Sequence, residues 1–270
     1  MTSIRPAAVA DMFYPGRPSV LARDVEDLLE EARARPGAAG TLPKAVIVPH
    51  AGYIYSGPVA ATAYARLQGG RGVISRVVLL GPVHRVPVRG LALPGADAFA
   101  TPLGNVPLDA EAVAAIRGLP QVVVSAQAHA LEHSLEVQLP FLQTVLGEFR
   151  LLPLAVGDAS AQDVAQVLEL LWGGGETLIV VSSDLSHYLP YDLATKVDAE
   201  TTRRILDLSV DIRHVEACGG TPVNGLLLAA RRHGLSPELL DLRNSGDTAG
   251  DRSRVVGYAS FAFLEVPHVR

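Results

Sequence analysis

The sequence contains few of the features that mark cross-linked or membrane-embedded proteins. It has a single cysteine, Cys218, in 270 residues. A lone cysteine cannot form an intramolecular disulfide, which is typical of proteins in a reducing compartment. No apolar run approaches the roughly 18 residues of a transmembrane helix, and the first residues lack an apolar segment of signal-peptide length. We therefore expect a soluble, intracellular, cytoplasmic protein.

An excess of basic residues is also missing. The 23 lysines and arginines are outnumbered by 28 acidic residues, which gives a net charge of −5. Because nucleic acids and anionic membranes bind basic surfaces, we expect neither as a partner. Hydrophobic residues make up 49% of the chain, enough for a large core. α/β chains of this length often form one domain, and we expect a single domain over residues 1–270.

Short runs rich in valine, isoleucine and leucine alternate with amphipathic helical patterns. Most runs lack polar alternation, which is typical of strands buried on both faces. The predicted strands are Ala45–Val48, Val77–Leu80, Val122–Val124, Leu151–Val156, Leu178–Val181 and Val255–Phe263. The predicted helices are Ser19–Ala34, Pro58–Leu67, Ala110–Ile116, Glu132–Leu146, Ala161–Trp172, Leu193–Leu208 and Val223–Arg232. This order predicts an α/β fold with a largely parallel sheet and helices on both faces.

Histidines follow several of the predicted strands. His50, His84 and His187 come after the first, second and fifth of them, and the third is followed by His129 and then by Glu132-His133 at the start of a predicted helix. Ligands of open α/β sheets bind beyond the carboxyl ends of the strands. One such histidine is most simply a hydrogen-bonded loop residue, but several together favour a metal or acid–base site. The Pro- and Gly-rich segment Arg89–Leu108 is expected to form a hairpin on the sheet edge or a loop over this pocket.

Cys218 lies just before a helical pattern, with Thr221 as a candidate N-cap and Pro222 as a candidate first helical residue. The positive end of a helix dipole favours thiolate, although a free cysteine is equally often a small buried hydrophobe. Two histidines and a thiolate are a suitable ligand set for iron, copper or zinc. We expect His214 and His268 to lie outside the site.

Carboxylates accompany these histidines. Asp184 lies three residues before His187, where it can orient a ring N–H or cap a short helix. Glu132 and Glu136 are one helical turn apart on either side of His133. They are open to interpretation as ligands, as a base or as a solvated helix face.

The order of these motifs resembles that of the Memo family, the protein B component of the AmmeMemoRadiSam system. The resemblance covers nearly the whole chain, and several separate motifs carry it. They are Pro49–Gly57, Leu80–His84, Glu132–Glu136, Ser182–Tyr188, Cys218–Pro222, Ser245–Asp247 and Val256–Ala259.

The resemblance implies a three-layer α/β/α sandwich similar to that of class III extradiol (LigB-like) dioxygenases. It implies His50, His84 and Cys218 as ligands of one metal ion, iron or copper in preference to zinc. His187 corresponds to the acid–base histidine of the dioxygenases, with Asp184 beside it, and His133 lies on a motif that lines the pocket. In bacteria and archaea the family is associated with radical-SAM and AMMECR-type proteins, which the resemblance implies as pathway partners.

One departure separates this chain from the dioxygenases, which hold ferrous iron with two histidines and a carboxylate. Here the third candidate ligand is Cys218, whose thiolate is softer and more easily oxidised. Three functions therefore remain open. The first is a metal-dependent redox enzyme, oxygenase- or oxidase-like, acting on an unknown small molecule. The second is a non-catalytic metal-binding or interaction protein, and the third is a hydrolase that uses Cys218 or zinc-bound water.

Overall fold

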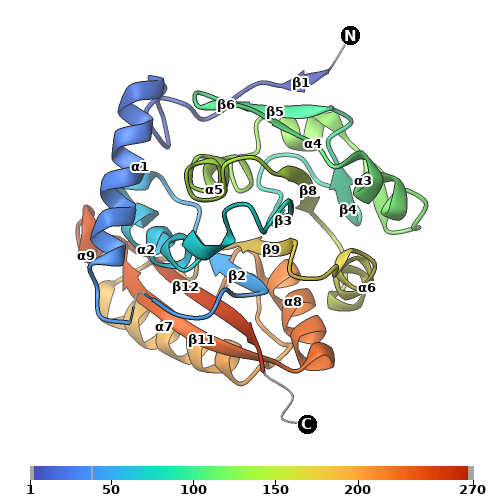
Figure 1. Cartoon of the computed structure of the whole chain (residues 1–270). Helices are drawn as coiled ribbons and strands as arrows, with labels where there is room; N and C mark the ends of the chain where they lie inside the picture. Colours follow the sequence, from blue (N-terminus) through green and yellow to red (C-terminus); the bar gives the residue numbers. More distant parts are fainter. Residues whose placement is uncertain (1–2, 38, 267–270) are drawn as a thin grey trace.

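The computed structural model describes residues 3–37 and 39–266, in which helices and strands alternate along most of the chain (Figure 1). The helices are α1 (Pro18–Arg33), α2 (Tyr53–Ala65), α3 (Ala110–Ile116), α4 (Ala126–Ala130), α5 (Leu139–Leu146), α6 (Ala161–Leu171), α7 (Tyr191–Leu206), α8 (Gly220–His233) and α9 (Ser245–Thr248), with 3-10 turns η1 (Gln68–Gly70) and η2 (Glu136–Gln138). The strands are β1 (Ile4–Arg5), β2 (Ala45–Val48), β3 (Arg76–Pro82), β4 (Leu91–Leu93), β5 (Ala98–Thr101), β6 (Gly104–Pro107), β7 (Val122–Val124), β8 (Arg150–Val156), β9 (Thr177–Ser182), β10 (His187–Leu189), β11 (Leu235–Asn244) and β12 (Val255–Glu265).

Nine strands of the described residues form the central sheet. Its order is β10-β12-β2-β9-β3-β8-β4-β7, with β11 also paired to β12. The central strands β2, β9, β3 and β8 run parallel to one another. Antiparallel pairs occur toward the edges, where β12 pairs with β2 and β4 pairs with β8. The parallel centre therefore brings the carboxyl ends of β2, β3 and β9 to one edge of the sheet.

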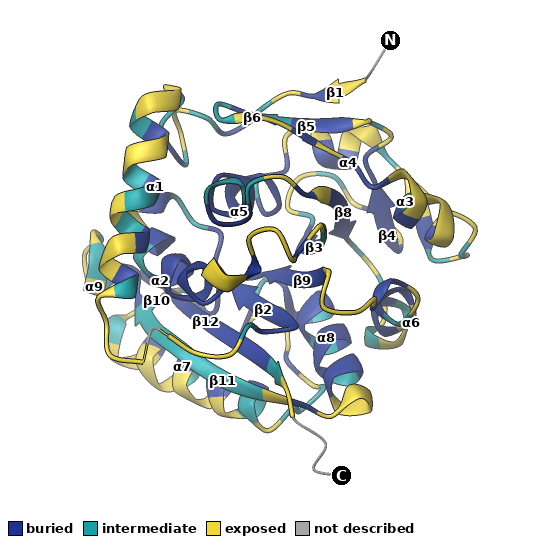
Figure 2. Cartoon of the chain, in the orientation of Figure 1, coloured by how far each residue is buried: buried dark blue, intermediate teal, exposed yellow. Residues whose placement is uncertain are grey.

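Helices cover both faces of this sheet, which gives the three α/β/α layers. Successive strand residues point to opposite faces. In β2, Val46 and Val48 pack in the core that also contains side chains of α1, α2 and α5. Ala45 and Ile47 pack in the second core, with α3, α6, α7 and α8. Figure 2 shows β2 buried throughout its length. Burial on both faces explains why these strands lack polar alternation, and the predicted fold class is confirmed.

All six predicted strands are present, but other strands were not predicted. The segment Arg89–Leu108 contains β4, which joins the central sheet, and the hairpin β5–β6. That hairpin pairs with β1 in a separate three-stranded sheet, so its expected place on the edge of the central sheet was wrong. Strand β11 was missed because its sequence, with Pro237 and several charged residues, does not form an apolar run. Its residues are mostly half-buried, although both α2 and α7 lie close to it.

The predicted helix Glu132–Leu146 begins later than expected. Residues 131–135 form a turn, η2 follows, and α5 starts only at Leu139. The Glu132 carboxylate accepts hydrogen bonds from the backbone N–H groups of His133 and Ser134, which holds the segment in this turn. The turn carries residues of the candidate site, described below.

The described helices also bear on the expected lack of a membrane span. The longest, α1 and α7, contain 16 residues each. None of the helices in the described part of the chain combines the length and the apolar character that crossing a membrane requires.

Candidate metal centre

Neighbouring parallel strands bring three of the predicted histidines to one edge of the sheet. His50 and His84 lie just beyond the carboxyl ends of β2 and β3, and His187 opens β10 shortly after β9. Strand β9 lies between β2 and β3 in the sheet. The parallel pairing of β2, β9 and β3 therefore explains why the histidines that follow these strands reach the same edge of the sheet.

A compact group of three imidazoles lies at this edge. The ring centroid of His50 is 5.2 Å from that of His84 and 5.3 Å from that of His133. The rings of His84 and His133 stack with their centroids 4.5 Å apart. One ligand nitrogen from each of the three lies within 4.8 Å of the other two. This arrangement can hold one metal ion, since imidazole nitrogen suits zinc, copper and iron.

His133 reaches the site by an unexpected route. Strand β7 pairs parallel with β4, which is antiparallel to β8, so β7 ends at the opposite edge from the site. Helix α4 and the following turn lead back to it. His129, on α4, stays outside the group: it is buried, and its Nε2–H donates to the Ala92 carbonyl at 2.7 Å. His214 is exposed and contacts the Cys218 carbonyl through Nδ1, and His268 lies outside the described residues.

Burial of His129 is expected to make the free energy of unfolding depend on pH. Its Nδ1 has no hydrogen-bond partner among the described residues, and burial lowers the pKa of His129 to about 4. The unfolded chain, with a pKa near 6.5, takes up this proton first as the pH falls. Stability is therefore lost between pH 6.5 and 4, by on the order of 2–3 kcal/mol from this residue. Urea unfolding at pH 7.5 and pH 4.5 should show a smaller difference for His129→Gln than for the wild type. An equal difference in both proteins would contradict this role for His129.

Glu132 fixes the orientation of His84. Its Oε1 accepts a hydrogen bond from His84 Nδ1 at 2.9 Å, and its Oε2 accepts the His84 backbone N–H at 2.7 Å. Burial raises the pKa of Glu132, but the His84 hydrogen bonds and the backbone N–H of Ser134 outweigh burial and lower it to about 2. An ionised carboxylate only accepts hydrogen bonds, so His84 carries a proton on Nδ1. Its Nε2 is then the atom that can bind a metal, as is usual when a carboxylate holds the other ring nitrogen.

Cys218 lies against the buried His50 ring. Its Sγ is 3.3 Å from His50 Nε2, and it also faces the Asp184 carbonyl at 3.7 Å. The next residue is a glycine because of a close approach: a Cβ at Gly219 would lie 2.7 Å from the Ser183 Cβ. The predicted ligands His50 and Cys218, 168 residues apart, are thus in direct contact.

The expectation of a thiolate does not hold for the protein without metal. Burial, and then the nearby Asp184 carboxylate, raise the pKa of the Cys218 thiol to about 12. Helix α8 begins at Gly220, so Thr221 lies inside the first turn and contacts His214 instead of capping the helix. Desolvation outweighs the helix dipole here because Cys218 is mostly enclosed by neighbouring side chains.

The structure places Asp184 near the site but not in the expected contact. Its Oδ1 accepts the backbone N–H of His50 at 2.7 Å, and burial raises its pKa to about 6. The ring of His187 is oriented instead by the Leu185 carbonyl, which accepts from Nδ1 at 2.8 Å. The predicted orienting role of Asp184 toward His187 was therefore wrong. Because His187 donates through Nδ1, its Nε2 carries a lone pair that can accept a proton.

Glu136 is neither a ligand nor part of a solvated face. It is fully buried and accepts hydrogen bonds from Arg5, from the Tyr14 hydroxyl and from the backbone N–H groups of Ala8 and Val9. The Arg5 guanidinium also donates to the carbonyls of residues 129 and 132. This network fastens the N-terminal segment to the turn that carries Glu132 and His133.

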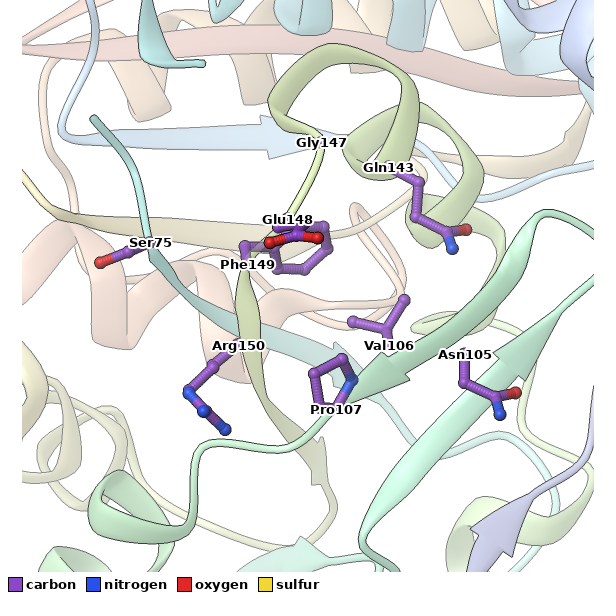
Figure 3. A pocket seen from close by; sticks show the side chains of 9 residues that line it. All are labelled: Ser75, Asn105, Val106, Pro107, Gln143, Gly147, Glu148, Phe149 and Arg150. Carbon is purple, nitrogen blue, oxygen red and sulfur yellow. The ribbon is translucent and has the colours of Figure 1, made fainter. Parts of the chain in front are cut away.

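A separate pocket of about 510 Å³ lies away from the histidines (Figure 3). Ser75 and Arg150, which line it, stand at the amino ends of β3 and β8. It therefore opens at the sheet edge opposite to the candidate metal centre.

Sequence reasoning did not single out Ser182, which contacts His50 Nδ1 at 2.9 Å through its hydroxyl. It is the last residue of β9. A polar residue at the carboxyl end of an otherwise apolar strand beside a histidine-bearing strand is the signal that would have identified it.

The chain is similar to known proteins over nearly its whole length. The family model for Memo-like proteins matches residues 5–262. A MEMO1 family protein of Methanopyrus kandleri is 38% identical over 96% of this chain and 98% of its own length. A MEMO1 family protein of Aquifex aeolicus is 37% identical over 97% of this chain and 99% of its own. The crystal structure of an uncharacterized protein from Escherichia coli K12, 14% identical, has a similar fold, with a TM-score of 0.51 over 80% of this chain and 98% of that one. From the family model and these relatives, the chain belongs to the Memo family.

Proposed function

We propose that this chain binds one iron or copper ion through His50, His84 and Cys218 and uses it in redox chemistry on a small molecule. The observation that carries the proposal is the group of His50, His84 and His133, whose ligand nitrogens lie within 4.8 Å of one another. Cys218 is not a member of this group, but its Sγ lies 3.3 Å from His50 Nε2. Three nitrogen donors and one sulfur donor at a single sheet edge match the preferences of these metals.

The donor set leaves two candidates for the third ligand. Cys218 is in contact with His50, and His133 stacks on His84. Burial lowers the pKa of His133 to about 4, so its ring is neutral at physiological pH. A neutral imidazole can itself bind a metal, so this pKa does not decide between the two. We assign the ligand role to Cys218 because its Sγ lies 3.3 Å from His50 Nε2, and we place His133 beside the ion, where it orients the substrate. The Phe13 ring packs against that of His133, with the two ring centroids 4.7 Å apart.

The surrounding residues have separate tasks in this proposal. A bound ion supplies one-electron chemistry and polarises a coordinated substrate atom. His187 takes or returns a proton through Nε2, because the Leu185 carbonyl holds Nδ1–H. Asp184 fixes the backbone of His50. The raised pKa of Cys218 argues against a hydrolase that uses this thiol as nucleophile, since the thiolate is the reactive form. Pathway partnership with radical-SAM and AMMECR-type proteins stays a prediction.

Titration with Co²⁺ under anaerobic conditions tests the metal site, because the bound ion absorbs in the visible region. The wild type should bind one ion per chain, and His50→Ala should lose this binding at the protein concentration of the titration. The matched control is His233→Ala, since His233 is a partly exposed histidine stacked on Trp172 outside the site. Equal loss in both variants, or binding of several ions regardless of His50, would contradict the site.

The redox role has its own readout. The protein loaded with iron or copper should be oxidised and reduced again, by electrochemical titration, without releasing the ion. Loss of the ion on oxidation, or no oxidation at any accessible potential, would contradict the redox role and leave a metal-binding protein.

A further inference from the structure

The Ser182 hydroxyl makes three polar contacts inside the protein, and their chemistry determines where its proton lies. Ser182 is fully buried. Its Oγ is 2.6 Å from the Ser134 carbonyl oxygen, 2.8 Å from Gln138 Nε2 and 2.9 Å from His50 Nδ1. A carbonyl oxygen can only accept, and a hydroxyl has one proton and two lone pairs. Ser182 therefore donates to Ser134 and must accept from both of its other partners.

The orientation of Gln138 is fixed independently. Its Nε2 lies 2.9 Å from the Pro49 carbonyl, which requires a donor, and its Oε1 accepts from the Tyr64 hydroxyl at 2.8 Å. The amide nitrogen thus has one N–H for Pro49 and one for Ser182. Gln138 is 1% exposed, and its polar atoms are all used. The side chain cannot turn over without placing the oxygen against the Pro49 carbonyl.

We propose that Ser182, held by Ser134 and Gln138, is a positioning residue that confines His50 to the tautomer with the proton on Nδ1. Within the described part of the chain, the His50 ring is the one partner left for the second lone pair of Ser182, so Nδ1 must donate. Nε2 then carries the lone pair, and it points at Cys218, whose S–H donates to it at 3.3 Å. The site is therefore preorganised for Nε2 coordination before any ion arrives.

Two independent groups produce the same tautomer in the two histidines. Glu132, in the turn after α4, accepts the Nδ1 proton of His84, which follows β3. Ser182, at the end of β9, accepts the Nδ1 proton of His50, which follows β2. The assignment to metal binding rests on the function proposed above, but the tautomer itself is a property of the protein without metal. The two can therefore be tested separately.

Long-range ¹⁵N–¹H correlation spectra of the metal-free protein report the tautomer of each histidine ring. In the wild type, His50, identified by comparison with His50→Gln, should show a protonated Nδ1 and an unprotonated Nε2. In Ser182→Ala the acceptor is gone, and a substantial population should carry the proton on Nε2. Ser182→Thr, which keeps the hydroxyl, should restore the wild-type pattern. His84 should keep its proton on Nδ1 in all three, which serves as an internal control for folding.

A protonated Nε2 in wild-type His50 would overturn the proposal even if every variant failed to fold. So would an unchanged His50 tautomer in a folded Ser182→Ala. The second measurement is Co²⁺ affinity, which should fall about 10- to 100-fold in Ser182→Ala and recover in Ser182→Thr. If Ser182→Ala bound Co²⁺ as tightly as the wild type does, this would contradict the proposal that Ser182 positions the His50 ring. The predicted tautomer in a wild type that binds no metal would contradict the proposed function and leave the tautomer assignment standing.

Discussion

Replacing Glu136 with glutamine is expected to lower the free energy of unfolding by about 3–5 kcal/mol, the usual cost of breaking a buried ion pair from one side. The carboxylate is fully buried and accepts from Arg5, Tyr14 and two backbone N–H groups. Glutamine keeps the shape but removes the charge that balances the Arg5 guanidinium. It also points an NH₂ group at donors that need an acceptor.

Urea unfolding near pH 7.5 measures this effect. The matched control is Glu200→Gln, which removes an acidic partner from an exposed pair with Arg203 on α7 and should change the free energy by less than about 1 kcal/mol. Because Arg5 also binds the turn that carries His133, Glu136→Gln should weaken Co²⁺ binding as well. A change in stability as small as that of the control would show that the network does not hold the N-terminal segment in place.

The parts of the fold that sequence predicted best depend on local patterns. Strands β2, β3, β8 and β9 are buried on both faces, so their residues are apolar without alternation. The placement of His50, His84 and His187 at one edge followed because these strands are parallel neighbours. Parallel pairing and the position of a residue just after a strand together predict a shared site.

Features that depend on contacts distant in sequence were missed. The reversed direction of β7 follows from its pairing with β4 and not from its own residues. Glu136 could be read as part of a solvated helix face, because its partners Arg5 and Tyr14 lie more than 120 residues away. The raised pKa of Cys218 depends on its enclosure in the folded chain, whereas the position before a helix predicted the opposite.

The affinity for Co²⁺ is expected to rise about tenfold for each unit of pH between pH 7.5 and 9. The reason is the Cys218 thiol, whose pKa burial raises to about 12. The thiol is protonated over this whole range, so coordination must release one proton per ion. The imidazoles of His50 and His133 do not contribute to the slope, because burial lowers their pKa values below the usual range.

This slope tests the ligand set directly. The measurement is the competition of the wild type and of Cys218→Ser with a chelator of known affinity for Co²⁺, across pH 7.5 to 9. If Cys218 is the third ligand, the affinity of the wild type rises by about 30-fold over this range, and that of Cys218→Ser, whose hydroxyl keeps its proton, stays nearly constant. A wild-type affinity as independent of pH as that of Cys218→Ser would contradict the account, and would identify neutral His133 as the third ligand beside His50 and His84.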